Sequence, residues 1–589
     1  MRKLISIGMM FFALTLCCQP ASYVPKHNGN NTPGGGGNEG GTGDGSLHRV
    51  YDIEAWTTVN SHAGEEKWSV LQPMYNDFSV QSHNYLVPGT DLSDEQKTVY
   101  YTRIKKMADG RYLLLYMGGQ TGSRCYCTTS DDLKTWAAPT MLLEPVQETV
   151  DGAKDWIRYS GPDAVVLSNG DVLAVFSYRA TNHYKYGTGC GLVTMRSKNN
   201  GLTWSQPQII YDAGATWEPY MLELPDGRIQ CYFTDPIPAC RNSGTSVLTS
   251  TDGGYTWSSK IRCSRYYKYD YDGSSTAYRG KKIFTDQMPS FRVLNDGKTL
   301  IGFLEARLES PASDSGNSYY KCSVVYNDGF DWKNLGEDTA GPARRHDLVV
   351  NGAAGYVSTF PSGEVVLSCN ISSIFSLKIL DHNGENFNAW DSGWLKAFTD
   401  AGSWGNTESE DGNKLLASFR SASRGAQIGR FWLNHTLFAT DSKVTVDGKA
   451  DEWPLKQALF VSGKNGSELM IRASRDASNL YLLADQYDVS SVKIYVSNTA
   501  PKLTVKAEIS SKGSMTLSGD GVTGKCVSAE TVKGGKGHVA EIKIPLSTLG
   551  ASTGDAVYVY ASVADSAGEV PFTNAVVSSP STWQRIVLK

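Results

Sequence analysis

Residues 250–257 read STDGGYTW, and the chain contains three imperfect copies of this octapeptide: TSDDLKTW (129–136), SKNNGLTW (197–204) and VYNDGFDW (325–332). An Asp in such a stretch can accept hydrogen bonds from nearby backbone amides in a tight turn, and a Gly adopts backbone conformations that other residues resist. The Trp is suited to packing between sheets. The repeat therefore predicts a recurring structural turn, in which Asp252 has an architectural role and takes no part in chemistry.

A second pattern, an alternating strand followed by Asp-Gly or a related dipeptide and then an apolar strand, recurs six times. Its copies are RIKKMADGRYLLLYM (103–117), DAVVLSNGDVLAVFS (163–177), YMLELPDGRIQCYF (220–233), SFRVLNDGKTLIGFLEAR (290–307), YVSTFPSGEVVLSC (356–369) and, more weakly, ESEDGNKLLASFR (408–420). Each dipeptide tolerates the positive φ of a hairpin turn. Six hairpins with four octapeptides predict an all-β fold with a six-bladed β-propeller over residues 47–439.

The remaining segments differ from this repeat. Residues 1–18 have a basic start and a short apolar run, typical of a signal peptide, and the Gly-rich composition of residues 19–46 predicts a flexible linker. Residues 440–589 have alternating strands without the octapeptide and predict a β-sandwich. Within them Trp453 could stack on a sugar ring or fill the core, and the core is the favoured position. The formal charge of −4 gives no basic field for nucleic acid.

Three of these stretches resemble known families. The octapeptide resembles the Asp-box of sialidase-like propellers, where it joins the third and fourth strands of a blade on the outer rim. SKVTVDGKADEWP (442–454) resembles the start of family 9-like carbohydrate-binding modules. LTLCC (14–18) resembles the lipobox of bacterial lipoproteins, which implies lipid attachment at Cys17 or Cys18 and a place in the cell envelope. Plain secretion is the alternative.

Candidate site residues follow from the propeller itself, because the inner strands of all blades converge on its axis. The position seven residues before the turn Gly holds Arg103, Asp163, Tyr220, Ser290 and Tyr356, and Asp286 lies close to it. Glu218, beside Trp217, lies nine residues before the turn Gly of the third repeat, and Glu305 ends the second strand of the fourth. Paired carboxyl groups across a pocket are the equipment of glycoside hydrolysis, and burial beside Trp217 would raise the pKa of Glu218.

The family resemblance assigns roles in two ways. TVYYTRI (98–104) is similar to the opening of sialidases, which implies that Arg103 grips a sugar carboxylate while Glu218 takes the proton of a nucleophilic Tyr356. The expected second arginine is missing from RIQCYFTDP (228–236), where no Arg follows until Arg241. The stretch WEP (217–219), followed by a Glu in a later blade, resembles the layout of exo-arabinanases. This resemblance instead implies that Glu218 is the general acid and Glu305 the nucleophile, with Tyr356 and Arg103 positioning the sugar.

Together with these patterns, the family resemblance implies an exo-acting, retaining glycoside hydrolase for an arabinose-type sugar. The expected substrate-binding residues are Arg103, Asp163, Trp217, Tyr220, Asp286, Arg345 and Arg420. We expect a monomer that needs no metal or other cofactor, binds no nucleic acid, and touches a membrane only through the lipid anchor. The alternatives are an exo-sialidase and, from another class, a glycan-binding lipoprotein without catalytic activity.

Overall fold

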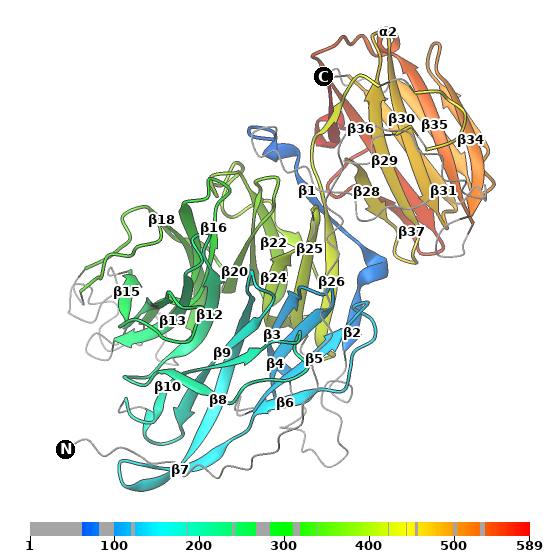
Figure 1. The fold of residues 1–589 in the computed structure, drawn as a ribbon. Coiled ribbons are helices and arrows are strands. Elements are labelled where there is room, and N and C mark those ends of the chain that lie inside the picture. The colour runs from blue at the N-terminus through cyan, green and yellow to red at the C-terminus, as the bar shows by residue number, and fades with distance from the viewer. Residues whose placement is uncertain are drawn as a thin grey trace. The chain divides into compact units, whose positions relative to one another are not determined.

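The computed structural model describes residues 62–81, 99–118, 124–184, 187–237, 242–266, 283–309, 318–336, 339–410, 412–421, 423–442, 444–450, 452–453, 457–498, 504–530 and 536–589. The expected signal peptide, linker and lipidation cysteines lie outside these residues, as does Arg241. The described chain folds almost entirely into antiparallel β-sheets (Figure 1).

Six sheets form a six-bladed β-propeller. Blade one contains β3 (Val99–Lys106), β4 (Tyr112–Gly118), β5 (Arg124–Ser130) and β6 (Thr140–Leu143), and blade two contains β7 (Val146–Val150), β8 (Ala153–Val166), β9 (Val172–Ala180), β10 (Cys190–Ser197) and β11 (Gln208–Tyr211). Blade three contains β12 (Trp217–Glu223), β13 (Ile229–Ile237), β14 (Asn242–Ser250) and β15 (Ile261–Ser264), and blade four contains β16 (Ile283–Val293), β17 (Thr299–Glu309), β18 (Ser318–Asp328) and β19 (Arg345–Val350). Blade five contains β20 (Ala353–Thr359), β21 (Val365–Ile371), β22 (Ile374–Leu380) and β23 (Leu395–Lys396).

The sixth blade closes the ring with strands from both ends of the propeller sequence. It contains β24 (Gly402–Ser409), β25 (Lys414–Ser421) and β26 (Gly425–Asn434), and β26 pairs with β1 (Val70–Pro73) and β2 (Ser79–Gln81) (Figure 1). The inner strand of each blade packs against the inner strand of the next, and β24 packs against β3. This arrangement leaves few open sheet edges.

The hairpins and the octapeptides lie where the sequence places them. In the first five repeats the turn glycines have φ between 72° and 113°, the left-handed conformation that these turns require. The four octapeptides join the last two strands of blades one to four, which in blade two are β10 and β11. Asp252 accepts hydrogen bonds from the backbone amides of Tyr255 (3.1 Å) and Thr256 (2.9 Å), which confirms its structural role in the turn.

The C-terminal domain is a sandwich of two sheets. One contains β27 (Leu437–Ala439), β38 (Gln584–Leu588), β36 (Ala556–Asp565), β31 (Ser491–Ser497), β32 (Val505–Ser510), β33 (Met515–Ser518) and β37 (Gly568–Pro571). The other contains β28 (Leu459–Ser462), β29 (Glu468–Arg475), β30 (Asn479–Tyr487), β35 (Lys536–Pro545) and β34 (Thr523–Glu530), and the short helix α2 (Leu546–Leu549) follows β35. Because β27 pairs with β38, the sandwich begins before the expected boundary at residue 440.

Trp453 of the sandwich is buried, and its indole Nε1 donates to Glu541 Oε1 at 2.8 Å. The residue therefore fills the core, as favoured from the sequence, and presents no face to a sugar. None of the helices in the described part of the chain is both long and apolar enough to cross a bilayer.

Candidate active site

The inner strand of every blade has a β-bulge at the same place, and the bulge sets the site. Its first residue lies in the left-handed region, with φ between 46° and 59°; these bulge residues are Tyr101, Gly161, Glu218, Met288, Ala354 and Trp404. A left-handed conformation costs a residue other than glycine roughly 1–2 kcal/mol. The bulge re-aims side chains that a regular strand would direct elsewhere, which is a common arrangement near active sites.

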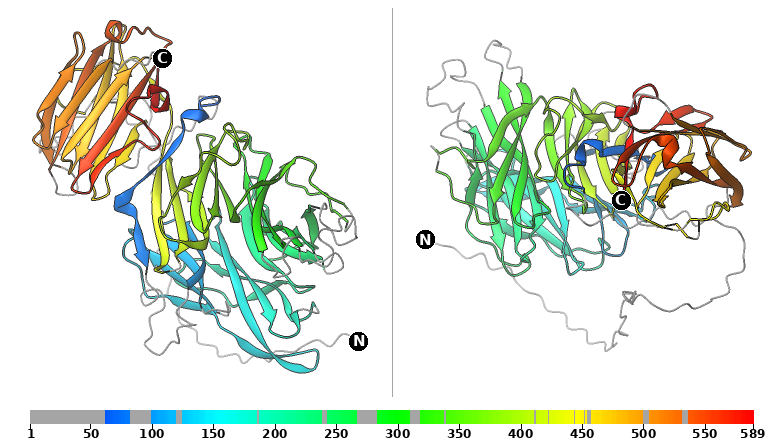
Figure 2. Two further views of the ribbon diagram at one scale, coloured as in Figure 1. Left: turned by 180° about the vertical axis from the view of Figure 1, so that it is seen from behind. Right: turned by 90° about the horizontal axis from the view of Figure 1, so that it is seen from above.

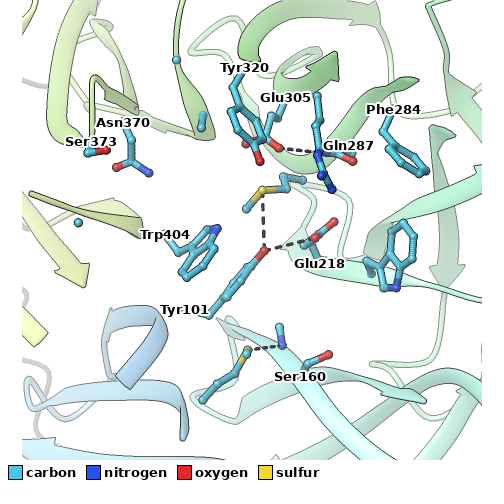
Figure 3. Close-up of a pocket in the computed structure, with 18 of the residues that line it drawn as sticks. Tyr101, Ser160, Glu218, Phe284, Gln287, Glu305, Tyr320, Asn370, Ser373 and Trp404 are labelled. Carbon is cyan, nitrogen blue, oxygen red and sulfur yellow. Dashed lines mark hydrogen bonds between the residues drawn. The ribbon is translucent and has the colours of Figure 1, made fainter. Parts of the chain in front are cut away.

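The bulges surround one cavity of about 940 Å³ at the end of the propeller axis where the inner strands begin. Five of the six bulge residues line it: Tyr101, Gly161, Glu218, Met288 and Trp404. Trp217 and Glu305, both predicted from the sequence, also line it. Figure 3 shows Glu218 and Glu305 in this cavity, contributed by the neighbouring blades three and four. The sequence therefore identified two carboxyl groups that the fold brings together.

Glu218 is held by two hydroxyl groups. Thr234 Oγ1 donates to Glu218 Oε2 at 2.7 Å, and the Tyr101 hydroxyl donates to Glu218 Oε1 at 3.3 Å (Figure 3). Burial raises the pKa of Glu218, while these hydrogen bonds and the nearby charge of Arg179 oppose the rise. The rise in pKa expected from the sequence is confirmed.

Glu305 is buried, and each of its oxygens accepts a hydrogen bond. Gln287 Nε2 donates to Oε1 at 2.5 Å, and the backbone amide of the bulge residue Ala354 donates to Oε2 at 2.6 Å. Burial raises the pKa of Glu305 to about 7, and the negative charge of Glu218 adds to the rise. The two carboxyl groups therefore influence each other, as groups that share one site do.

Tyr101 is the main site residue that the sequence analysis missed. Its ring stacks on Trp404 with centroids 5.2 Å apart, and its hydroxyl reaches Glu218. Burial and the charge of Glu218 hold its pKa well above the usual range, so the hydroxyl remains a proton donor. Counting seven residues back from the turn Gly selects Arg103 in blade one and Tyr220 in blade three. The residues that line the cavity, Tyr101 and Glu218, each lie two positions earlier in the sequence.

Four predicted residues lie beneath the cavity in a buried axial network and do not line its wall: Arg103, Asp163, Tyr220 and Tyr356. The Lys105 ammonium of blade one donates to the Tyr356 hydroxyl at 3.1 Å and lies 3.7 Å from Asp163. The Tyr356 hydroxyl also faces Asp163, at 3.4 Å, and it has no hydrogen bond with Glu218. The expected pair in which Glu218 deprotonates Tyr356 is therefore not formed.

This axial network joins the blades. Glu408 of blade six binds Lys105 at 2.9 Å and Arg292 of blade four at 2.8 Å. The ring of Tyr220 from blade three packs against Tyr356 of blade five with centroids 5.5 Å apart. Buried charges of both signs compensate one another here, which a buried ion network requires. The positions selected by the repeat thus belong to the inner packing of the ring.

Three other residues predicted to bind substrate do not line the cavity: Asp286, Arg345 and Arg420. Arg345 forms an ion pair with the buried Asp286, with Nη2 to Oδ1 at 2.9 Å. Arg420 donates to the carbonyl of Val99 at 3.2 Å and lies over the ring of Tyr100. Neither arginine lines the cavity. Its lining includes two other arginines among the described residues, Arg179 and Arg307.

Arg179 lies on β9, where its Nη2 donates to Ser160 Oγ at 3.0 Å. No group of three or more His, Cys, Asp or Glu side chains suited to a metal ion occurs in the described part of the chain. The polar side-chain groups of the described cavity lining are carboxyl, hydroxyl, amide and guanidinium, beside aromatic rings and the thioethers of Met117 and Met288.

Residues 41–276 match the family model described as a BNR repeat-like domain. No curated protein matches the sequence.

Among solved structures, the chain is similar to the GH93 α-L-arabinofuranosidase of Fusarium graminearum in complex with arabinobiose, at 18% identity and a TM-score of 0.43, over 59% of this chain and 97% of that one. It is similar to the α-L-arabinanase of Penicillium chrysogenum complexed with arabinobiose, at 17% identity and a TM-score of 0.41, over 62% and 98%. Similarity to the NanB sialidase of Streptococcus pneumoniae is 11% identity with a TM-score of 0.39, over 59% and 70%.

Proposed function

We propose that this protein is an exo-acting glycoside hydrolase in which Glu218 and Glu305 are the working carboxyl groups. The observation that supports this most directly is that two carboxyl groups of neighbouring blades face one cavity and each has a raised pKa. A retaining reaction needs a nucleophile that forms a covalent glycosyl intermediate and an acid that protonates the leaving oxygen. Both groups are supplied by this pair without a metal ion.

We propose a neutral, arabinose-type sugar as the terminal unit that is released. A sugar carboxylate is best bound by several convergent guanidinium groups. The three arginines predicted to bind substrate are engaged with other protein groups: Arg103, Arg345 and Arg420. The described cavity lining instead contains two other arginines, Arg179 and Arg307. This arrangement favours a neutral sugar over sialic acid, which is the alternative substrate.

The roles of the two carboxyl groups can be assigned in two ways. The sequence resemblance makes Glu218 the acid and Glu305 the nucleophile, and the donors at both oxygens of Glu305 favour its charged form. The pKa of about 7 at Glu305 favours the reverse assignment, because an acid must hold its proton near neutral pH. If Glu305 is the acid, kcat/KM falls as the pH rises through about 7; if it is the nucleophile, kcat/KM falls as the pH drops below 7.

The activity is tested by incubating the purified protein with aryl α-L-arabinofuranosides, arabinan and sialyl-lactose. We expect release of arabinose or arabinobiose, and NMR of the first-formed product should show the anomeric configuration of the substrate. Release of sialic acid would select the alternative enzyme. Binding of a glycan without turnover of any of them would select the non-catalytic lipoprotein.

Azide rescue assigns the roles of Glu218 and Glu305 separately. Each is replaced by Ala and given an activated aryl substrate with sodium azide. A retaining enzyme that lacks its nucleophile forms the glycosyl azide of inverted configuration, whereas one that lacks its acid/base forms the azide of retained configuration. If azide restores neither variant, the two-carboxylate mechanism is wrong.

We propose further that the protein is a monomer anchored to the cell envelope through a lipid on Cys17 or Cys18, with the sandwich as a carbohydrate-binding module. Labelling of growing cells with an alkynyl fatty acid tests the anchor, and Cys17→Ala combined with Cys18→Ala should abolish the label. Because Trp453 is in the core, sugar binding by the sandwich would use other side chains. Affinity electrophoresis in polysaccharide gels tests this binding.

A further inference from the structure

The wall of the cavity continues outward along one face of blade two. Ser160 and Arg179 line the cavity from β8 and β9, and Figure 3 shows Ser160 at its edge. Side chains two residues apart on a strand point to the same face, so Arg158 and Trp156 share the face of Ser160. In the antiparallel register Arg158 lies opposite Arg179, which places both on this face.

β8 is unusually long, and its outer part forms a hairpin with β7 that extends past the neighbouring blades (Figures 1 and 2). In that hairpin Trp156 lies opposite Gln147, whose side chain is exposed. Trp156 is 49% exposed. No described residue stacks on it or hydrogen-bonds to it. The face therefore ends in a flat, open aromatic ring with polar groups beside it.

The backbone under Trp156 is held on both sides. Its amide donates to Asp155 Oδ1 at 2.8 Å, and its carbonyl accepts from the amide of Thr181 at 2.9 Å. Asp155 is buried on the opposite face of β8 and also accepts the His183 Nδ1 hydrogen bond at 2.7 Å. The segment tied down by Asp155 leads directly to Tyr184, which lines the cavity. Trp156 is thus part of a fixed surface that is connected to the site.

We propose that this face, with Trp156, Arg158 and Gln147, is an extended subsite for the inner sugar units of a glycan chain whose terminal unit lies in the cavity. This inference rests on the proposed hydrolase function. Four residues of strand separate Ser160 from Trp156, about 13 Å, which exceeds the reach of one sugar but not of an oligosaccharide. A sugar ring presents C–H groups to the indole and hydroxyls to the guanidinium and amide at its sides.

The subsite makes the protein an enzyme for polymeric substrates, in which affinity rises with chain length. Continuity with the cavity wall favours a glycan chain over a protein partner or a second copy of this chain, because only a molecule that also enters the cavity would use both ends of the face.

The test measures binding of α-1,5-linked arabino-oligosaccharides, from the disaccharide to the hexasaccharide, by calorimetry to the full chain with Glu218→Gln. We expect Trp156→Ala to weaken binding of the hexasaccharide about tenfold and to reduce the ratio of hexasaccharide to disaccharide affinity. Trp156→Tyr should recover part of that ratio. Tyr255→Ala, which removes an equally exposed ring from a rim turn, should leave it unchanged.

An equal loss for short and long chains, or no loss, would overturn the extended subsite. Hydrolysis of an aryl arabinofuranoside by the wild-type protein separates this result from failure of the proposed function, since that substrate is too short to reach Trp156. Absence of both hydrolysis and binding refutes both proposals. A dimer in sedimentation that Trp156→Ala dissolves would assign the face to self-association instead.

Discussion

The outer rim and the inner bulges of the propeller both recur from blade to blade, but the rim repeats its side chains and the bulges repeat only their backbone conformation. On the rim the side chains recur: Asp132 and Asp252 each accept hydrogen bonds from two backbone amides and a Thr hydroxyl in their turns. At the inner bulges only the backbone recurs, with the same left-handed conformation and a different side chain in each blade.

This difference separates architecture from chemistry. A side chain that serves the turn recurs wherever that turn is used, in blades one to four, so the rim can be recognised as a motif. A backbone bulge that directs any side chain toward the axis allows one blade to contribute Glu218, another Tyr101 and another Trp404. In this propeller, the cavity therefore lies where the backbone conformation repeats from blade to blade and the side chains differ.

The strongest test of this contrast is Glu218→Gln, which removes ionisable chemistry from one bulge and preserves its shape. We expect kcat to fall by about 10²–10⁴-fold, because the pair of carboxyl groups is broken. The fold should be retained, because Gln has nearly the same shape as Glu. Steady-state kinetics and circular dichroism measure the two effects. Glu223→Gln, on the same strand outside the cavity, is the matched control and should retain activity; full activity of the Glu218 variant would end the assignment.

Glu305 provides a pH-dependent test. Its pKa is raised in the folded protein from an ordinary value of 4.5 to about 7, so folding favours the protonated form. Its contribution to stability is present below pH 4.5 and is lost as the pH rises through 7, a change on the order of 3 kcal/mol. Glu305→Gln should therefore raise the melting temperature at pH 8 more than at pH 4.5, and an equal shift at both pH values would contradict the buried charge.

A smaller effect is expected from Tyr101→Phe, which removes the hydroxyl that donates to Glu218 and leaves the ring on Trp404. Loss of one hydrogen bond to a charged group corresponds to roughly a tenfold decrease in kcat/KM. Tyr100→Phe, at the neighbouring position, controls for the substitution. If both variants behave alike, Tyr101 belongs to the packing of the wall and has no part in positioning Glu218.

The smallest effect is expected at the rim. Asp252→Ala removes the acceptor that holds one exposed turn, so we predict a slightly lower melting temperature and unchanged kcat and KM. Differential scanning calorimetry and kinetics on the same sample measure both. A loss of activity comparable to that of Tyr101→Phe would show that rim and cavity are coupled, contrary to the comparison above.

The fold could be predicted because its signals are local. Asp252 and Trp257 mark a turn by their own chemistry, and glycines such as Gly110 and Gly227 mark the hairpins by their positive φ. Counting such turns gave six blades. The sandwich begins earlier than the predicted residue 440 because β27 pairs with β38, which lies at the far end of the domain. No local sequence pattern reveals a pairing between strands so far apart.

The site was harder to predict because the bulge changes which residues face the cavity. Counting back from the turn assumes a regular strand and selects Arg103 and Tyr220, which the bulge places below the cavity. Glu218 was found through its chemistry beside Trp217, and Glu305 as a second carboxyl group in the next blade. Arg179 was missed since it lies on a second strand, beyond the positions that the repeat singles out.

The closure of the sixth blade also limits the order in which strands can pair. Val70 of β1 pairs with Asn434 of β26, so the first strand of the propeller stays unpaired until the last one is available. Pairing across so long a stretch of chain is slow, and unpaired strand edges readily join other chains. A chain that stops short of β26 therefore leaves β1 unpaired and the ring open, and we expect such fragments to be captured by chaperones or to aggregate.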